Sequence, residues 1–228
     1  MKLVLFDIDG TLIDSGGAGV RALDYAFREL FAVNDAFRHI SMAGKTDLQI
    51  MREGLTAHGI TSKGGHFGIV SRLMKGYLLH LGREMQNTHK QLKPGIREAL
   101  DALSAMDGHI ALGLLTGNIE EGARTKLEAF ALNHYFPAGA FGSDDEDRNR
   151  LLPVARSRFE LLLGHEIDYK DCIIVGDTPL DVYCAKPYGA FSIGVATGPY
   201  QFDELVKAGA DRVFETLADT GTFLRALE

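Results

Sequence analysis

Pairs of aspartates stand at two places where an apolar run of the chain gives way to turn-forming residues. Asp7 and Asp9 are separated by one residue, so both carboxylates can point to the same side of an extended segment. Asp177 and Asp181 follow a later apolar run. Carboxylates that converge, such as Asp7, Asp9 and Asp177, repel one another unless a cation or a proton intervenes. Their hard oxygen ligands suit Mg²⁺, so these aspartates are candidate ligands of a magnesium ion.

A third polar cluster, Thr116-Gly117-Asn118, lies between the two aspartate pairs and directly before a helical pattern. It offers a hydroxyl and backbone N–H groups, and the N-terminus of a helix is a natural anion site. Gly10, after the first aspartate pair, permits a sharp exit of the backbone and a close approach to a ligand. With Mg²⁺ bound, an acidic site can accept a phosphate dianion. The three clusters together therefore indicate phosphoryl transfer.

Short apolar runs that favour β-structure recur along the chain and alternate with helical patterns. The expected strands cover residues 2–8, 110–115, 138–141, 172–175, 191–195 and 212–214. The expected helices cover residues 94–106, 119–130, 153–163, 180–188 and 200–207. Continuous apolar strands are typical of a parallel sheet that is buried on both faces. The alternation predicts an α/β fold with a doubly wound, Rossmann-like parallel sheet, whose ligands bind at the carboxyl ends of the strands.

The alternation stops between residues 15 and 92, where we expect no strand. Helical patterns cover residues 19–31, 47–58 and 67–81, and Gly64-Gly65 is expected to form a loop between two of these helices. This interval is too long for a single crossover and predicts an inserted α-helical cap subdomain. The expected domains are a core of residues 1–14 and 93–228 and a cap of residues 15–92.

Composition limits the class of protein and its partners. The 228 residues are 46% hydrophobic and carry a formal net charge of −7, which disfavours nucleic acid as a main partner. No run approaches the roughly 20 apolar residues of a membrane span, and Asp7 and Asp9 interrupt the apolar N-terminus too early for a signal peptide. We expect a cytoplasmic protein, a monomer or homodimer, in which Cys172 and Cys184 are reduced.

The three clusters resemble known motifs. Residues 7–11, 116–118 and 176–181 are similar to motifs one, two and four of the haloacid dehalogenase-like hydrolase superfamily. The resemblance spans essentially the whole chain, and the helical interval falls where members with an α-helical cap carry theirs. The chain resembles the helical-cap phosphatases of the phosphoglycolate-phosphatase-like group, although phosphoglycolate, sugar phosphates and nucleoside monophosphates all suit an enzyme with such a cap. The resemblance implies a Mg²⁺-dependent phosphatase that acts on a small phosphorylated metabolite.

The resemblance also implies a role for each motif residue. Asp7 would attack phosphorus and form an aspartyl-phosphate, and Asp9 would act as general acid and then general base. Mg²⁺ would be held by Asp7, Asp177 and the backbone carbonyl of Asp9. Asp181 would either belong to the metal site or orient another group, and the sequence leaves both readings open. Thr116 and the backbone of Gly117 would bind phosphoryl oxygens. The residues expected to bind substrate are Gly10, Thr11, Gly117, Asn118 and Lys45.

The third motif departs from the usual family pattern, in which a lysine stands near a proline. Here the corresponding stretch holds two arginines, Arg148 and Arg150, ahead of Pro153. A guanidinium can bridge a carboxylate and a phosphate through its planar fork, so either arginine can replace the lysine chemically. Counting back from Pro153 favours Arg150, whereas the Asp-Arg-Asn segment that some members carry favours Arg148. We favour Arg148 and keep both as candidates.

The cap sequence offers one candidate for specificity. Gly44-Lys45-Thr46-Asp47 resembles the cap loop that reaches over the active site in phosphoglycolate-phosphatase-like members. Lys45 could neutralise a second acidic group of the substrate, or it could be a solvated surface lysine.

Two other functions remain beside the phosphatase. Asp9 argues against a dehalogenase, which lacks the second aspartate of motif one because no leaving alkoxide needs a proton. A sugar-phosphate mutase retains both aspartates, although Thr11 is more similar to the phosphatases. A non-catalytic binding protein that keeps the fold is the third possibility, but it would be expected to lose Asp7, Asp9 or Asp177.

Overall fold

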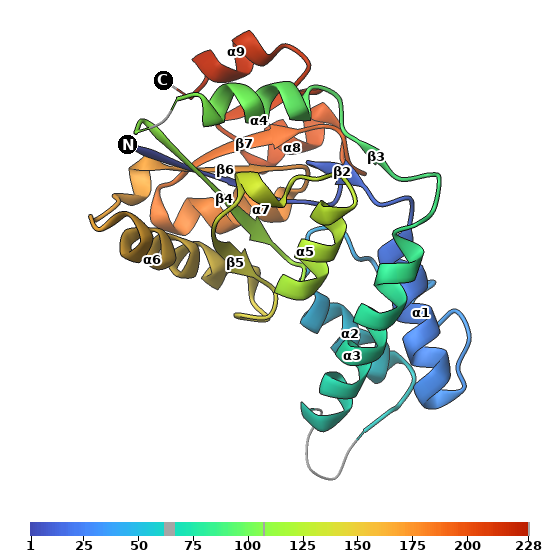
Figure 1. Ribbon diagram of the computed structural model, residues 1–228. Coiled ribbons are helices and arrows are strands. Elements are labelled where there is room, and N and C mark those ends of the chain that lie inside the picture. The colour runs from blue at the N-terminus through green and yellow to red at the C-terminus, as the bar shows by residue number, and fades with distance from the viewer. Residues whose placement is uncertain (62–66, 107, 228) are drawn as a thin grey trace.

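The computed structural model describes residues 1–61, 67–106 and 108–227 and contains a parallel sheet at its centre (Figure 1). Within these residues the sheet has six strands in the order β5-β4-β1-β6-β7-β8. The strands are β1 (Lys2–Phe6), β4 (Ile110–Thr116), β5 (Gly139–Phe141), β6 (Cys172–Gly176), β7 (Phe191–Val195) and β8 (Arg212–Phe214). All five pairings in the sheet are parallel. The predicted doubly wound parallel sheet is therefore confirmed.

The central strand β1 explains why its sequence is continuously apolar. Leu3 and Leu5 point to one face of the sheet, Val4 and Phe6 point to the other, and all four are fully buried. β1 pairs with β4 on one side and β6 on the other, so the chain order reverses beside it. A crevice at the carboxyl end of such a reversal is the usual ligand site of an open α/β sheet.

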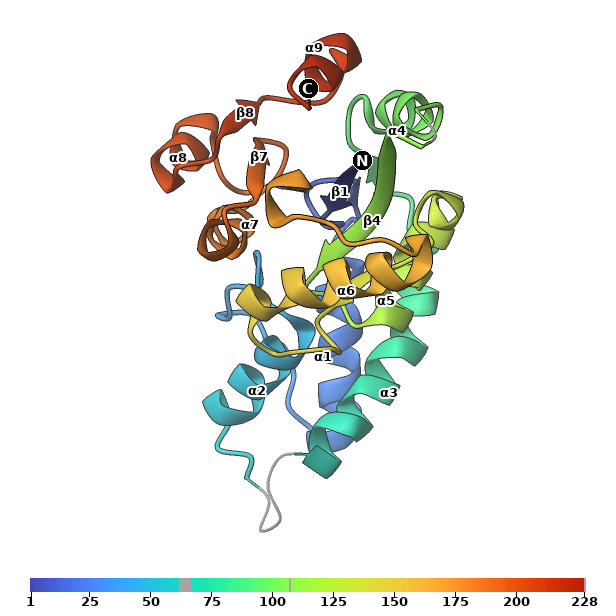
Figure 2. The ribbon, with the colours of Figure 1, turned by 90° about the vertical axis from the view of Figure 1, so that its left-hand side faces the viewer.

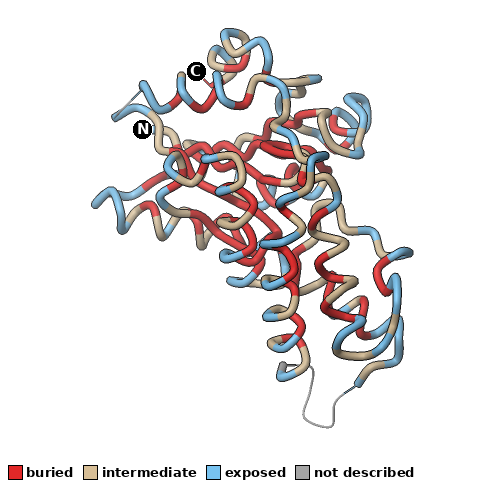
Figure 3. The backbone as a smooth tube through the Cα atoms, turned by 45° about the vertical axis from the view of Figure 1, so that its right-hand side comes forward, coloured by how far each residue is buried: buried red, intermediate tan, exposed pale blue. Residues whose placement is uncertain are grey.

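Helices cover both faces of the sheet. Apolar side chains of α4 (Ile96–Ser104), α5 (Glu120–Glu128) and α9 (Thr220–Arg225) pack on one face. Those of α6 (Leu151–Leu163) and α7 (Pro179–Ala185) pack on the other, with α8 (Phe202–Ala208) beside α7. Short 3₁₀ turns complete the connections: η1 (Asn133–Tyr135), η2 (Arg148–Arg150), η3 (Tyr169–Asp171) and η4 (Lys186–Tyr188). Figure 3 shows the buried residues concentrated along the strands between these layers.

Three further helices, α1 (Ala18–Phe31), α2 (Asp47–Ala57) and α3 (Phe67–Glu84), extend from one end of the sheet (Figure 2). They enclose an apolar core of their own, which includes Leu23, Phe27, Met51, Leu73 and Tyr77. This separate core supports the division into a core of residues 1–14 and 93–228 and a cap of residues 15–92, which stays our proposal. The expected Gly64-Gly65 loop lies outside the described residues.

The connection between the sheet and these helices corrects one expectation. Two short strands, β2 (Ile13–Asp14) and β3 (Gln91–Leu92), pair antiparallel with Ile13 opposite Leu92. The expectation of no strand up to residue 92 is therefore wrong at its last two residues. A two-residue strand shows no alternation in the sequence, and its pairing depends on a partner far away in the chain.

The last helix, α9, is not among the helices expected from the sequence. It begins at Asp219, whose side chain accepts a hydrogen bond from the Thr222 N–H at 3.0 Å. Cys172 and Cys184 are buried free thiols, as expected. No helix of the described segments has the length and apolar character that a membrane crossing requires.

Candidate active site

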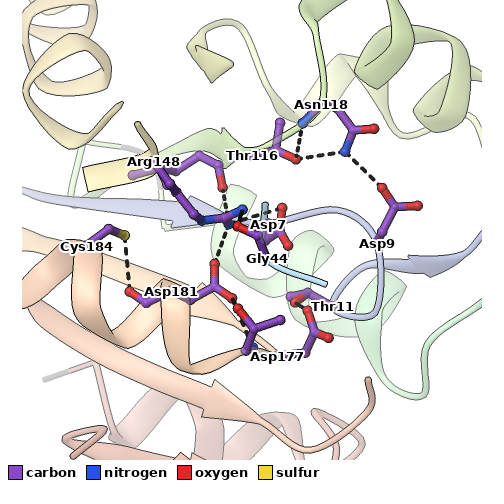
Figure 4. Close-up of polar contacts among 12 residues, drawn as sticks. Asp7, Asp9, Thr11, Gly44, Thr116, Asn118, Arg148, Asp177, Asp181 and Cys184 are labelled. Atoms are coloured by element: carbon purple, nitrogen blue, oxygen red, sulfur yellow. Dashed lines mark hydrogen bonds and ion pairs between the residues drawn. The ribbon is translucent and has the colours of Figure 1, made fainter. Parts of the chain in front are cut away.

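Three aspartates meet at the carboxyl end of the two central strands (Figure 4). Asp7 follows β1, Asp177 follows β6, and Asp181 lies in the first turn of α7. β1 and β6 are adjacent and in register, with Phe6 opposite Val175, so their ends are side by side. One carboxylate oxygen from each aspartate lies within 4.8 Å of the other two. At most 5% of each residue is exposed, so these charges are almost completely removed from water.

Arg148 supplies positive charge to this cluster. Its Nη2 donates a hydrogen bond to Asp181 Oδ1 and lies 3.4 Å from Asp7 Oδ1. The guanidinium is fixed by two backbone oxygens, because Nη1 donates to Gly44 at 3.1 Å and Nη2 to Leu115 at 3.3 Å. Arg148 is only 6% exposed. It therefore connects the aspartates of the sheet domain to the loop before α2.

Arg150 lies outside the aspartate cluster. Its side chain is 71% exposed and approaches Asp145 Oδ2 at 3.6 Å and Asp147 Oδ2 at 3.9 Å. Both arginines belong to the 3₁₀ turn η2, which has about three residues per turn, so residues two apart point in different directions. For this reason only one of the two predicted arginines contacts the cluster.

Asp9 is held by two side chains that follow β4. Asn118 donates through Nδ2 to Asp9 Oδ2 at 2.8 Å and to Thr116 Oγ1 at 2.9 Å. Lys126, on α5, donates to the same Asp9 oxygen at 2.6 Å and to Asn118 Oδ1 at 2.6 Å. Burial raises the pKa of Asp9, but Lys126 and Asn118 lower it by more, so it falls below its ordinary value. Asp9 is therefore held as a carboxylate.

Lys126 is a residue of the site that is not among those predicted from the sequence, although its position on the apolar face of a helix indicates it. Gly122, Ala123 and Leu127 form the buried face of α5, and Lys126 occupies the same face. It is 4% exposed. A lysine in phase with the apolar residues of a helix is rarely buried without a partner, and here the partner is the Asp9 carboxylate.

Asp177 is positioned by the turn that follows Asp9. The Thr11 hydroxyl donates to Asp177 Oδ1 at 2.9 Å, and Thr11 is fully buried. Gly10 has a positive φ of 86°, and a Cβ at that position would lie 2.2 Å from Asp177 Oδ2. Glycine is therefore required here both by its conformation and by the close approach of the carboxylate. Thr11 contacts an aspartate of the cluster, and Gly10 makes room for it.

Both oxygens of Asp181 already have donors. Oδ2 accepts hydrogen bonds from the Thr178 N–H at 3.0 Å and the Thr178 hydroxyl at 2.7 Å, which caps α7. Oδ1 accepts from Arg148. Of the two readings that the sequence leaves open for Asp181, this geometry favours orientation of Arg148.

The loop before α2 is inserted against the sheet domain. The Asp47 N–H donates to the Gly117 carbonyl at 2.7 Å, and Asp47 Oδ2 accepts from the Ile119 N–H at 2.9 Å. These two bonds flank the loop that holds Asn118. A Cβ on Gly117 would lie 2.1 Å from the Lys45 carbonyl oxygen. Asp47, in the first turn of α2, therefore ties the cap helices to the loop after β4.

Lys45 lines the same cavity as the catalytic candidates, but a carboxylate of this chain already neutralises its charge. Its ammonium forms an ion pair with Glu53 Oε2 at 2.5 Å. The lysine is neither a free cation nor a solvated surface residue.

The charges of the cluster suit a bound cation. Burial raises the pKa of Asp7 to about 6, although Arg148 opposes the shift. Burial and the charges of Asp7 and Asp181 raise the pKa of Asp177 well above its ordinary value. Carboxylate pKa values rise when negative charges are crowded without compensation. The donors of the cluster are all oxygens, so they fit a hard divalent ion such as Mg²⁺.

A cavity of about 290 Å³ connects the aspartates to the cap. Asp7, Asp9 and Asp177 line one end. The other end is lined by apolar and aromatic side chains of the cap: Val20, Leu23, Met42, Ile50 and Tyr77. The site can therefore hold a charged group at the sheet and a less polar group below the cap.

Comparisons with known proteins place the chain in a family. The sequence pattern of the haloacid dehalogenase-like hydrolases matches residues 4–195. The chain is 27% identical over 233 residues to a phosphoglycolate phosphatase of Vibrio cholerae, covering 100% of this chain and 97% of that one. It is 28% identical over 226 residues to the phosphoglycolate phosphatase of Rhodospirillum rubrum, covering 98% of this chain and 90% of the relative.

Solved structures show the same fold. A hydrolase from Pseudomonas syringae superimposes with a TM-score of 0.73 at 23% identity, covering 99% of both chains. CbbY from Rhodobacter sphaeroides, solved in complex with phosphate, superimposes with a TM-score of 0.74 at 17% identity, covering 97% of this chain and 96% of that chain. The family match covers most of the sequence, including Asp7, Asn118, Arg148 and Asp177. The chain belongs to the haloacid dehalogenase-like hydrolase family, and it is a hydrolase.

Proposed function

We propose that this hydrolase is a Mg²⁺-dependent phosphatase that cleaves small phosphate monoesters through Asp7. The observation that carries the proposal is the cluster of Asp7, Asp177 and Asp181, three buried carboxylates served by one buried guanidinium, Arg148. Such a cluster needs further positive charge, which a divalent ion supplies. The names of the Vibrio cholerae and Rhodospirillum rubrum relatives support a phosphate ester as the substrate.

The first step is attack by Asp7 on phosphorus. An oxygen of the Asp7 carboxylate forms a bond to phosphorus while the bond between phosphorus and the ester oxygen breaks, which leaves an aspartyl-phosphate and an alkoxide. Asp9 must carry a proton for this step, although Lys126 and Asn118 lower its pKa in the free site. The negative charge of a phosphate bound beside it would raise that pKa, so Asp9 would then hold a proton and give it to the leaving oxygen. Asp7 lies at the carboxyl end of β1 and lines the cavity, so it is accessible to a phosphate there.

The second step returns Asp7 to its original state. A water molecule attacks phosphorus, Asp9 takes a proton from that water, and the bond between phosphorus and the Asp7 oxygen breaks to release inorganic phosphate. The contacts of Asp9 with Lys126 and Asn118 hold it as a carboxylate, which is the form that accepts this proton.

The phosphoryl oxygens would be bound by groups at the ends of the neighbouring segments. The Gly117 N–H and the Arg148 guanidinium would provide donors, and Gly10 and Asn118 line the cavity next to them. The Thr116 hydroxyl would be a further donor, as the family pattern implies; it is fully buried and accepts a hydrogen bond from Asn118. Thr11 would act through Asp177, because its hydroxyl is bonded to that carboxylate. Asp181 would act through Arg148.

Mg²⁺ would be held by Asp7, Asp177 and the backbone carbonyl of Asp9, and when bound it neutralises the charge that develops on the phosphoryl oxygens. Arg148 is the better candidate than Arg150 for the third motif, because it contacts Asp7 while Arg150 is exposed and pairs with loop aspartates.

The test is release of inorganic phosphate from p-nitrophenyl phosphate by the whole chain. We expect turnover with Mg²⁺, loss of turnover with EDTA, and loss in the Asp7→Asn variant. Activity that survives Asp7→Asn would contradict the role of Asp7, and no metal-dependent activity above that variant would favour a non-catalytic binding protein. Transfer of phosphate between two positions of a sugar phosphate, without release, would instead identify a mutase.

A further inference from the structure

Each cationic side chain that lines the described cavity already has a carboxylate partner from this chain. Arg148 pairs with Asp7 and Asp181, Lys126 pairs with Asp9, and Lys45 pairs with Glu53. Arg148 and Lys126 are held at the phosphate end by the aspartates of the site. Lys45 is the cation of the loop before α2, so its partner decides how much positive charge the rest of the cavity offers.

The pair of Lys45 and Glu53 is well fixed. Glu53 Oε2 accepts from Lys45 at 2.5 Å, and Glu53 Oε1 accepts from Gln49 Nε2 at 2.9 Å. Gln49 and Glu53 are four residues apart on α2, so they lie on the same side of the helix. Both carboxylate oxygens of Glu53 are thus engaged, and the glutamate is oriented toward the lysine. The side chains of Lys45 and Glu53 are 22% and 36% exposed, respectively.

Among the described residues, the rest of the cap end of the cavity offers no further cation to an anion. Val20, Leu23 and Ile50 provide an apolar wall. Asp47, which also lines the cavity, adds negative potential. An acidic group on the leaving part of a substrate would meet this wall and this potential, whereas an uncharged group would not.

We propose that Glu53 neutralises Lys45 and so makes the cavity select phosphate esters with an uncharged leaving group over esters that carry a second acidic group. The inference rests on the proposed function, because it concerns the leaving group of a phosphate ester bound at Asp7. Phosphoglycolate, which the relatives' names indicate for them, carries such a second acidic group. Glu53 is then a specificity-determining residue that acts through Lys45.

The experiment compares two ligands that differ only in this charge. Phosphoglycolate carries a carboxylate, and carbamoylmethyl phosphate carries an uncharged amide in its place. Both are titrated calorimetrically, with Mg²⁺, into the Asp7→Asn protein, so that the result does not depend on turnover. We expect the amide to bind roughly tenfold more tightly, because unit charges a few ångströms apart interact appreciably in a partly buried site.

Adding Glu53→Gln to that protein frees Lys45, and we expect the affinity for phosphoglycolate to rise roughly tenfold relative to the amide. Adding Lys45→Ala as well should abolish the gain. The matched control is Glu84→Gln, which breaks an ion pair of the same 2.5 Å length, between Glu84 and Arg21, neither of which lines the cavity. This control should leave the ratio of the two affinities unchanged.

Three results would overturn the inference: tighter binding of phosphoglycolate than of the amide while Glu53 is present, a change of less than twofold in the ratio with Glu53→Gln, or a gain that survives Lys45→Ala. The proposed function is judged separately, by release of phosphate from the unaltered chain. If the unaltered chain releases no phosphate, the proposed phosphatase function is wrong. The ratio of the two binding affinities is measured without turnover and would still stand.

Discussion

Arg148 brings positive charge into contact with the buried aspartates, and its removal leaves them uncompensated. It contacts Asp7 and Asp181 and is only 6% exposed. Removing one partner of a buried ion pair leaves an uncompensated charge, which typically costs about 3–5 kcal/mol. The same guanidinium is placed to bind phosphoryl oxygens, so a substitution there should affect both stability and turnover.

We expect Arg148→Ala to lower kcat by at least about a hundredfold, which is the usual effect of losing one donor to developing charge. Urea unfolding should show a loss of roughly 3 kcal/mol. Arg150→Ala is the matched control, because its exposed ion pairs contribute about 0–1 kcal/mol at most. Loss of turnover in Arg150→Ala with retention in Arg148→Ala would reverse our assignment of the third motif.

Asp47 is a buried carboxyl whose ionisation should affect the stability of the protein. Burial raises its pKa to about 6, with Lys126 opposing the shift. The folded chain thus binds this proton more tightly than the unfolded chain does. The resulting stabilisation is complete below pH 4, where the unfolded aspartate is also protonated, and is lost as the pH rises through 6.

Asp47→Asn keeps an acceptor for the Ile119 N–H and removes the titration. We measure the free energy of unfolding in EDTA at pH 5 and at pH 7.5. In the wild type, deprotonation of Asp47 should lower it by about 1 kcal/mol over this range, and in the variant this contribution should be absent. The control is Asp203→Asn, at an exposed position in the first turn of α8. An identical pH dependence in wild type and Asp47→Asn would show that the buried carboxyl does not titrate in this range.

The element that joins the two parts of the molecule is the loop before α2. It lies between the segment after β4 and the segment that carries Arg148. The Thr46 hydroxyl donates to the Glu146 carbonyl at 2.8 Å, and Arg52 forms an ion pair with Glu146 at 3.0 Å. Gly117 permits this approach because it has no Cβ.

Gly117→Ala tests the contact directly. The added Cβ would lie 2.1 Å from the Lys45 carbonyl, so the loop must move away while the Gly117 N–H is retained. We expect kcat/KM to fall by roughly a hundredfold, because displacements of about 1 Å have effects of this size. Gly82→Ala, in α3 where no atom lies within 4 Å of the new Cβ, should leave kcat/KM unchanged and stabilise the helix by up to about 1 kcal/mol. Equal kinetics for the two variants would show that close docking of the loop is not needed.

At the scale of the whole molecule, the cluster joins the end of β1 to the segment after β6, about 170 residues later in the chain. A cation bound there should stabilise the folded state, because it binds only when these segments are assembled. Protons compete with it, since the pKa of Asp7 is raised to about 6 and that of Asp177 is also raised.

Mg²⁺ at about a hundred times its Kd should add about 2.7 kcal/mol, and so raise Tm by roughly 5–10 °C, at pH 7.5. The shift should be smaller at pH 5, where Asp7 is mostly protonated. Differential scanning calorimetry with Mg²⁺ and with EDTA measures both. Asp177→Asn should reduce the shift, and a full shift in that variant would exclude the cluster as the metal site.

The six strands of the parallel sheet, the helices other than α9 and the carboxylates at the strand ends could be predicted from the sequence alone. A strand buried on both faces must be continuously apolar, as Leu3 to Phe6 are, and a polar residue directly after it must lie at the edge of the sheet. The convergence of Asp7 and Asp177 follows from this rule together with the right-handed parallel topology. These are local consequences of burial, so they are visible in the order of residue types.

Other features of the site were decided only by the tertiary structure. Three features depend on how a side chain or strand faces a partner far away in the chain. They are the contact of Arg148 rather than Arg150 with Asp7, the ion pair of Lys126 with Asp9, and the pairing of β2 with β3. The neutralisation of Lys45 by Glu53 spans only eight residues, yet it requires α2 to begin where it does. The energy of such a hydrogen bond or ion pair depends on the distance and orientation of its two groups. Packing sets both, and the residue types alone do not reveal them.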